Sequence, residues 1–164
     1  MIRMSKLADY SFILLLQMVS EDKASWAASE LASRTTLPSP TVAKLMKLLA
    51  KSGVVTGQRG ASGGYRLAAP AEDISIARIV EAVDGPIALT DCAAKDVGGE
   101  VNNNNDHDCA VRSHCPMHGG WNKVNRAMRG ALENVFLSDL ISVSSWQSVT
   151  AHKAAHPAAK APGA

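Results

Sequence analysis

All three cysteines of the chain lie in one polar stretch, residues 92–118, which we call the cysteine segment. They are Cys92, Cys109 and Cys115. The residues between them include the run Asn102–Asn105 and are typical of a loop rather than of a packed element. Three cysteines in such a polar loop are not explained as residues of a hydrophobic core. We therefore expect them to bind a metal or a metal cluster, and binding would then be coupled to ordering of the loop.

The cellular compartment bears on this chemistry. No run of residues approaches the ~18 apolar positions of a membrane span, and the first residues lead into an amphipathic pattern rather than a signal region. We therefore expect a cytoplasmic protein with no membrane partner. Cysteines stay reduced there, and an odd count of three favours metal or redox use over disulfides.

Charge is distributed unevenly along the chain. Residues 1–70 carry nine Lys and Arg against four Asp and Glu, whereas residues 71–115 carry three against nine. Residues 116–164 are basic again, with five against two. A basic first block is typical of contact with nucleic-acid phosphates, although a solvated surface gives the same count. The acidic block would repel DNA, so we expect the cysteine segment to face away from it.

Three helices are predicted in the basic block. Apolar residues at three- and four-residue steps predict the first helix from Ser5, its N-cap, to about residue 21, with Asp9 in or just after its first turn. A second helix is predicted over about residues 26–34. Ser39 is predicted to cap the third helix, which Gly53 ends. The buried stripe of the third helix is predicted to be Val42, Leu45, Met46 and Leu49.

The other side of the third helix is polar and basic. A short helix, a tight turn and such a helix form the helix-turn-helix arrangement, in which the second helix of the motif reads the DNA major groove. A plain helical pair with a solvated lysine face remains the alternative. The predicted DNA-facing residues are Ser39, Thr41, Ala43, Lys44, Lys47 and Lys51.

A β-hairpin is predicted directly after the helix-turn-helix. Residues 54–58 form one strand, the glycine-rich residues 59–64 form a turn, and residues 65–67 return. A hairpin in this position is a wing. We expect Arg59 to enter a narrow minor groove, with Ser62 also at the DNA. A glycine-rich phosphate loop of an enzyme is excluded, because no strand–loop–helix follows and no Lys-Ser/Thr pair ends it.

The remainder is predicted to be helical outside the cysteine segment. Ser75 caps a helix over about residues 76–83. A long helix over about residues 121–137 and a short one over 138–146 follow. The long helix is predicted to bury Trp121, Val124, Met128, Ala131, Leu132, Val135 and Phe136, and to expose Asn125, Arg126, Arg129 and Glu133. Such a helix on a small winged module is most readily buried against its copy in a homodimer.

These elements predict a mainly α fold with a small β-hairpin wing. The predicted organisation is a winged helix-turn-helix DNA-binding domain, a linking helix, the cluster-binding cysteine segment, a dimerisation helix region and a disordered tail. Their ranges are 1–70, 71–91, 92–118, 119–148 and 149–164.

Several motifs carry a family resemblance, which covers about residues 1–140. They are Lys6–Tyr10, Leu37–Val42, Arg59–Leu67, Gly85–Cys92 and Ser113–Pro116, continuing through Trp121. The chain resembles the Rrf-two family of bacterial winged-helix regulators, and looks closest to the branch that controls SUF iron–sulfur assembly operons. The resemblance implies a homodimeric repressor that binds a palindromic operator in double-stranded DNA and responds to the state of an iron–sulfur cluster.

The resemblance also implies that Cys92, Cys109 and Cys115 each ligate this cluster, of the 2Fe-2S or 4Fe-4S type. The family commonly has a shorter interval between its first two cysteines than the sixteen residues found here. For the fourth ligand, His118 falls where some members have a histidine ligand. Asp9 falls where others have an aspartate that reaches the partner subunit's cluster. An external thiol is the third possibility.

Two other interpretations of the thiols remain open. Cys92, Cys109, Cys115 and His118 would also suit a tetrahedral zinc site, in a regulator that has no cluster. A thiol-dependent enzyme would need a base and an orienting group beside one cysteine. The chain contains no recognisable nucleophile motif, although histidines occur near the cysteines.

Overall fold

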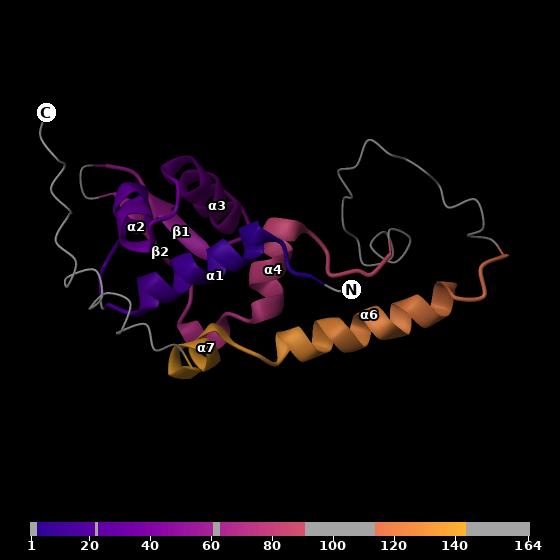
Figure 1. Cartoon of the computed structure of the whole chain (residues 1–164). Coiled ribbons are helices and arrows are strands. Elements are labelled where there is room, and N and C mark those ends of the chain that lie inside the picture. The colour runs from indigo at the N-terminus through magenta and orange to yellow at the C-terminus, as the bar shows by residue number, and fades with distance from the viewer. Residues whose placement is uncertain (1–2, 22, 61–62, 91–113, 144–164) are drawn as a thin grey trace, which may run out of the picture.

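The computed structural model describes residues 3–21, 23–60, 63–90 and 114–143. Figure 1 shows a body of helices with a small hairpin, from which one long helix extends. The elements in chain order are α1 (Lys6–Val19), α2 (Ala28–Thr35), α3 (Ser39–Lys51), β1 (Val55–Gln58), β2 (Gly64–Leu67), the 3-10 helix η1 (Ala71–Asp73), α4 (Ile76–Asp84), α6 (His118–Glu133) and α7 (Leu137–Val143). The disordered-tail prediction, residues 149–164, lies outside the described residues. No helix in the described ranges is long and apolar enough to cross a membrane.

Helix α1 begins at the predicted cap. The Ser5 hydroxyl accepts a hydrogen bond from the Ala8 backbone N–H at 3.0 Å and donates one to Asp84 Oδ1 at 2.6 Å. The cap therefore satisfies a free N–H group of the first turn and also joins α1 to the last residue of α4. The inner side of α1, with Leu14 and Leu15 fully buried, lies in the core of the body.

Helices α2 and α3 form the predicted helix-turn-helix. Thr36 makes the turn in the left-handed region (φ 59°), which is unusual for a β-branched residue. The prediction that Ser39 caps α3 is wrong. Pro38 is the N-cap, with no side-chain hydrogen bond, and Ser39 is the first helical residue. Gly53 follows the end of α3 in the left-handed region (φ 73°), as predicted.

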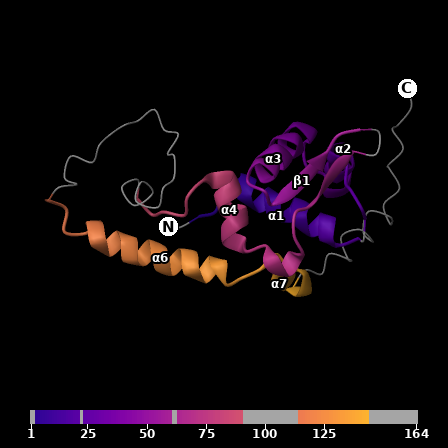
Figure 2. The ribbon, with the colours of Figure 1, turned by 180° about the vertical axis from the view of Figure 1, so that it is seen from behind.

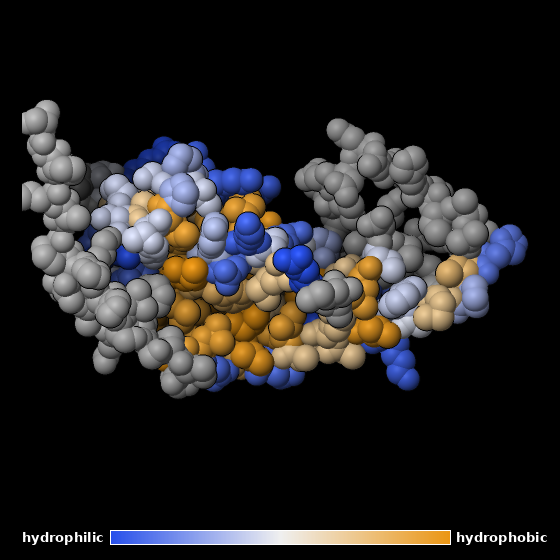
Figure 3. Space-filling model, viewed as in Figure 1, coloured by the Kyte–Doolittle hydropathy of each residue, from blue (hydrophilic) through white to orange (hydrophobic). Residues whose placement is uncertain are grey.

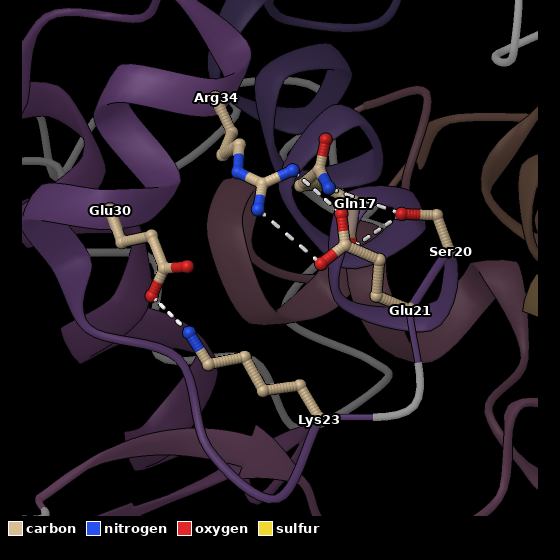
Figure 4. Close-up of polar contacts among 6 residues, drawn as sticks. All are labelled: Gln17, Ser20, Glu21, Lys23, Glu30 and Arg34. Carbon is tan, nitrogen blue, oxygen red and sulfur yellow. Dashed lines mark hydrogen bonds and ion pairs between the residues drawn. The ribbon is translucent and has the colours of Figure 1, made fainter. Parts of the chain in front are cut away.

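A cluster of charged side chains fixes α2 against the end of α1 (Figure 4). Arg34 of α2 donates to Glu21 at 2.6 Å, and Lys23 pairs with Glu30. The Lys23 ammonium lies 4.9 Å from the ring centroid of Trp26, and the Arg34 guanidinium lies 5.9 Å from it. Exposed ion pairs contribute only about 0–1 kcal/mol each. The main effect of this cluster is therefore to orient α2.

The wing is an antiparallel pair, β1 and β2, with Val55 opposite Leu67 and Gln58 opposite Gly64. The predicted second helix was to begin at Trp26, but Trp26 is extended. Its N–H and C=O groups both bond Tyr65 of β2 at 2.8 Å. A Cβ atom on Gly64 would lie only 2.7 Å from the Trp26 carbonyl oxygen. This close backbone approach requires glycine at that position.

Helix α4 packs between α1, α3 and α6, and Ser75 caps it by accepting from the Arg78 N–H at 3.3 Å. The two predicted C-terminal helices, over about 121–137 and 138–146, are both present with shifted bounds. α6 ends at Glu133. After it, the Ile76 N–H donates to the Val135 carbonyl at 2.8 Å and the Leu137 N–H donates to the Ile74 carbonyl at 2.9 Å. These bonds form a β-bridge between Ser75 and Phe136, which is not compatible with a continuing helix. A separate helix, α7, then packs on η1 and α1.

Helix α6 extends beyond α4, away from the rest of the body, in both views (Figures 1 and 2). Several of its predicted inward residues are not buried in the single chain, since Val124 is 41% exposed and Ala131 is also exposed. The prediction that Asn125 is exposed is wrong, because this residue is 3% exposed and faces the body. Figure 3 shows apolar surface over α1, α7 and part of α6, whereas the surface over α2 and α3 is mostly hydrophilic.

Candidate nucleic-acid interface and cysteine segment

The predicted DNA-facing residues of α3 share one side of the helix. The four predicted core residues, Val42, Leu45, Met46 and Leu49, are all fully buried. Helical periodicity therefore places the remaining residues toward the solvent. Of the predicted set, Ser39, Lys44, Lys47 and Lys51 are exposed, and Thr41 and Ala43 are half-buried. Among the described contacts, none of the three lysines forms an ion pair with a carboxylate.

The wing carries two exposed arginines. Arg59 directly follows β1 and is exposed, whereas Ser62 lies outside the described residues. Arg66 of β2 is exposed as well, and its Nε–H donates to Thr56 Oγ1 of the neighbouring strand at 3.1 Å. Arg59 and Arg66 thus place one exposed cation on each side of the glycine-rich turn.

A contact that the sequence analysis missed joins the end of α3 to α4. Arg78 Nη2 donates to the Gly53 carbonyl at 2.7 Å, just beyond the C-terminus of α3. A cation at the end of a helix interacts favourably with its dipole and with its free carbonyls. The position of Arg78 in the first turn of α4 carries no local signal for this contact, because its acceptor lies 25 residues earlier in the chain.

Only part of the predicted metal site falls within the described residues. Cys92 and Cys109 lie outside them. Cys115 is a half-buried free thiol three residues before α6, and His118 is the first residue of α6. Asp9 is exposed in the first turn of α1. Over the described ranges, no three Cys, His, Asp or Glu side chains converge as a metal site. The donor set itself, three thiols with a histidine or a carboxylate, fits an iron–sulfur cluster in chemistry.

The chain just before Cys92 is anchored on α6. Ile87 is buried, and the Leu89 backbone N–H donates to Asn125 Oδ1 at 3.0 Å. One helical turn later, Arg129 Nη2 donates to Glu81 Oε2 of α4 at 3.4 Å. Arg129 Nε lies 3.2 Å from Glu81 Oε1 and 3.0 Å from Glu133 Oε1, but its N–H is not aligned for a hydrogen bond. The side of α6 that faces the body is therefore partly polar.

The family is decided by comparison with known proteins. A family model named Rrf2, an iron-dependent transcriptional regulator, matches residues 4–143. The chain belongs to the Rrf2 family. The HTH-type transcriptional regulator IscR of Photobacterium profundum is 30% identical over 107 residues, which are 65% of this chain and 56% of the relative. IscR of Salmonella paratyphi B is 29% identical over 120 residues, 73% of this chain and 66% of the relative. The chain thus spans 56–66% of the length of these relatives.

Solved structures agree with the Rrf2 fold. CymR (YrzC), the global cysteine regulator of B. subtilis, matches with a TM-score of 0.61 and 21% identity, covering 88% of this chain and 100% of CymR. IscR of T. potens matches with a TM-score of 0.55 and 20% identity, covering 97% and 94%. The predicted mainly α fold with a β-hairpin wing is confirmed.

The Rrf2 relatives are transcriptional regulators and not enzymes, so the thiol-enzyme interpretation is wrong. A groove lies between the end of α1, Trp26 and the base of the wing. Its volume is about 350 Å³, and Trp26, Arg66 and Glu72 are among its lining residues.

Proposed function

We propose that this Rrf2-family chain is a homodimeric DNA-binding repressor whose affinity for its operator depends on an iron–sulfur cluster. The single observation that carries the DNA-binding part is the exposed basic side of α3, opposite four fully buried residues and next to a basic wing. In a winged helix-turn-helix the second helix of the motif enters the major groove. Because DNA is the proposed partner, the protein is expected to act in the cytoplasm.

The proposed contacts divide by role. Ser39, Thr41, Ala43 and Lys44, near the start of α3, would meet base edges, since the first residues of a recognition helix approach the bases. Lys47 and Lys51 would bind phosphates. In the wing, Arg59 would enter the minor groove, with Ser62 near it.

The proposed dimer would bury the apolar surface that one chain leaves open. Val124 and Ile141 are 41% and 37% exposed, and α1 adds the half-buried Ile13 and Leu16. Figure 3 shows apolar surface over α1, α7 and part of α6. A twofold dimer would use this surface on both copies and would place two α3 helices on the two halves of a palindromic operator.

Within this proposal, Cys92, Cys109 and Cys115 hold the cluster, and His118 or the partner subunit's Asp9 supplies the fourth ligand. A cluster with a non-cysteine ligand supplies a labile centre whose loss can report iron status or oxidation. The family description as iron-dependent supports this assignment. By the resemblance stated above, the controlled genes would be those of SUF cluster assembly.

The proposal is tested by anaerobic purification, followed by visible absorption and by counts of iron and acid-labile sulfide. A brown protein with matched iron and sulfide is expected, and Cys92→Ala, Cys109→Ala and Cys115→Ala should each lose the colour. A comparison of Asp9→Ala with His118→Ala then assigns the fourth ligand. Gel-shift titration of the cluster-loaded and cluster-free forms, on a duplex that the wild-type protein selects from a random pool, measures the control of DNA binding.

Two outcomes would overturn parts of the proposal. A protein that stays colourless after reconstitution with iron and sulfide would reject the cluster, and zinc found by metal analysis would replace it. Equal duplex affinity of the loaded and cluster-free forms would reject control by the cluster while leaving DNA binding intact.

A further inference from the structure

We infer that Asn125 is a positioning residue that fastens the start of the cysteine segment to α6 and couples this segment, through α4, to the end of the reader helix α3. The inference rests on the proposed function for its regulatory consequence. Its structural part stands on contacts of described residues alone.

The fastening is a single side-chain bond. Asn125 is 3% exposed, and its Oδ1 atom accepts the Leu89 backbone N–H at 3.0 Å across 36 residues of sequence. Leu89 is three residues before Cys92. Ile87 is buried as well. The chain that leads to Cys92, the first proposed ligand, is therefore held at Ile87 and at Leu89.

The residue type at 125 is informative. Asn125 is the only almost fully buried residue among the positions of α6 with described burial, so this position holds an amide rather than an apolar side chain. The Nδ2 group of Asn125 has no hydrogen-bond partner among the described residues. A buried, unpartnered polar group costs about 1–3 kcal/mol. Packing alone would be better served by leucine, so the Oδ1 bond to Leu89 is the reason for an asparagine here.

The same side of α6 continues the connection to α4. Arg129, four residues after Asn125, pairs with Glu81 of α4. Three residues before Glu81, on the same side of α4, Arg78 donates to the Gly53 carbonyl beyond the end of α3. A displacement of the start of the cysteine segment therefore reaches α3 through two helices and three polar contacts. Such a chain of contacts requires a direct measurement of coupling.

The structural part is tested on the cluster-free, full-length protein by amide hydrogen exchange, read at Leu89 by NMR. Asn125→Leu removes the acceptor and nearly keeps the volume, whereas Asn125→Asp keeps an acceptor oxygen. Arg126→Leu places leucine at an exposed position of the same helix, on the side opposite Val124. We expect exchange at Leu89 to be about tenfold faster or more in Asn125→Leu. Exchange at Leu89 should be unchanged in Arg126→Leu and remain slow in Asn125→Asp.

The regulatory part is tested by the ratio of duplex affinities between the cluster-loaded and cluster-free forms. This ratio should move toward one in Asn125→Leu and stay at the wild-type value in Asn125→Asp and Arg126→Leu. A merely structural role would weaken both forms equally and leave the ratio unchanged, which would overturn the coupling. Unchanged exchange at Leu89 in Asn125→Leu would overturn the fastening. A wild-type ratio of one would instead reject cluster control in the proposed function, while the exchange result would still decide the role of Asn125.

Discussion

Helices α3 and α6 have similar lengths but differ in how much of each the chain buries. Four apolar residues of α3 have no exposed surface, and its charged residues all point outward. In α6 the inward position 125 is an asparagine, and apolar residues such as Val124 remain exposed. Within the described residues, α3 buries its apolar side in its own chain, whereas apolar residues of α6 such as Val124 stay exposed.

The difference shows how the two helices are stabilised. The buried side of α3, the proposed reader helix, packs on α2, α4 and β1. Short helices gain most of their stability from tertiary packing. In the described part of the chain, α6 packs on α4 and holds the chain at Leu89, while Val124 stays exposed. A second copy of the chain is the proposed source of the missing packing.

The largest expected effect is on stability. Leu45→Ala in α3 should lower the free energy of unfolding by about 2–5 kcal/mol, because it leaves a cavity in the core. Val124→Ala in α6 should change it by no more than about 0.5 kcal/mol in dilute monomer, as surface substitutions do. Urea unfolding followed by circular dichroism measures both. Equal losses would show that α6 is as fully packed as α3 within one chain.

The next effect concerns association. Val124→Asp should raise the dimer dissociation constant roughly 30-fold, equivalent to ~2 kcal/mol, because a carboxylate would be buried in the interface. Arg126→Asp introduces the same residue on the opposite side of α6 and serves as the control. Sedimentation velocity over a concentration series measures the constant. A wild-type protein that sediments as a monomer at all concentrations would remove the proposed explanation for the exposed side of α6.

The smallest effect concerns the charged sides. Lys47→Ala should weaken binding to the selected duplex and reduce the slope of log K against log salt by about 1, because one phosphate contact is lost. Lys123→Ala removes the same charge from α6 and should change neither quantity. Arg59→Ala should weaken binding without changing cluster content. If Lys47→Ala and Lys123→Ala behave alike, α3 is not the reader.

Features set by neighbouring residues were predictable from the sequence. The caps Ser5 and Ser75, the end of α3 at Gly53 and the buried stripe of α3 all depend on contacts within about four residues. The wrong prediction that Ser39 caps α3 is off by a single residue. Pro38, with φ −58°, takes the N-cap position itself and makes no side-chain hydrogen bond, so α3 begins one residue earlier than a Ser39 cap would place it.

Features set by distant partners were not predictable. Trp26 is extended because it pairs with Tyr65, and α6 ends at Glu133 because Val135 and Leu137 bond the chain around Ile74. Asn125 is polar, and an amphipathic pattern assigns it to the exposed side although Leu89 makes it an inward residue. The ligand roles of Cys92 and Cys109 remain predictions.

The bridge between Trp26 and Tyr65 has a consequence for solubility. A two-stranded hairpin exposes unpaired N–H and C=O groups along its edges, and such edges can recruit strands of other molecules into aggregates. Here the outer edge of β2 is occupied at Tyr65 by a segment of the same chain, and Gly64 lets that segment approach within contact distance. A side chain at position 64 would push it away and reopen the edge. The glycine that shapes the wing thus also protects the protein against edge-to-edge aggregation.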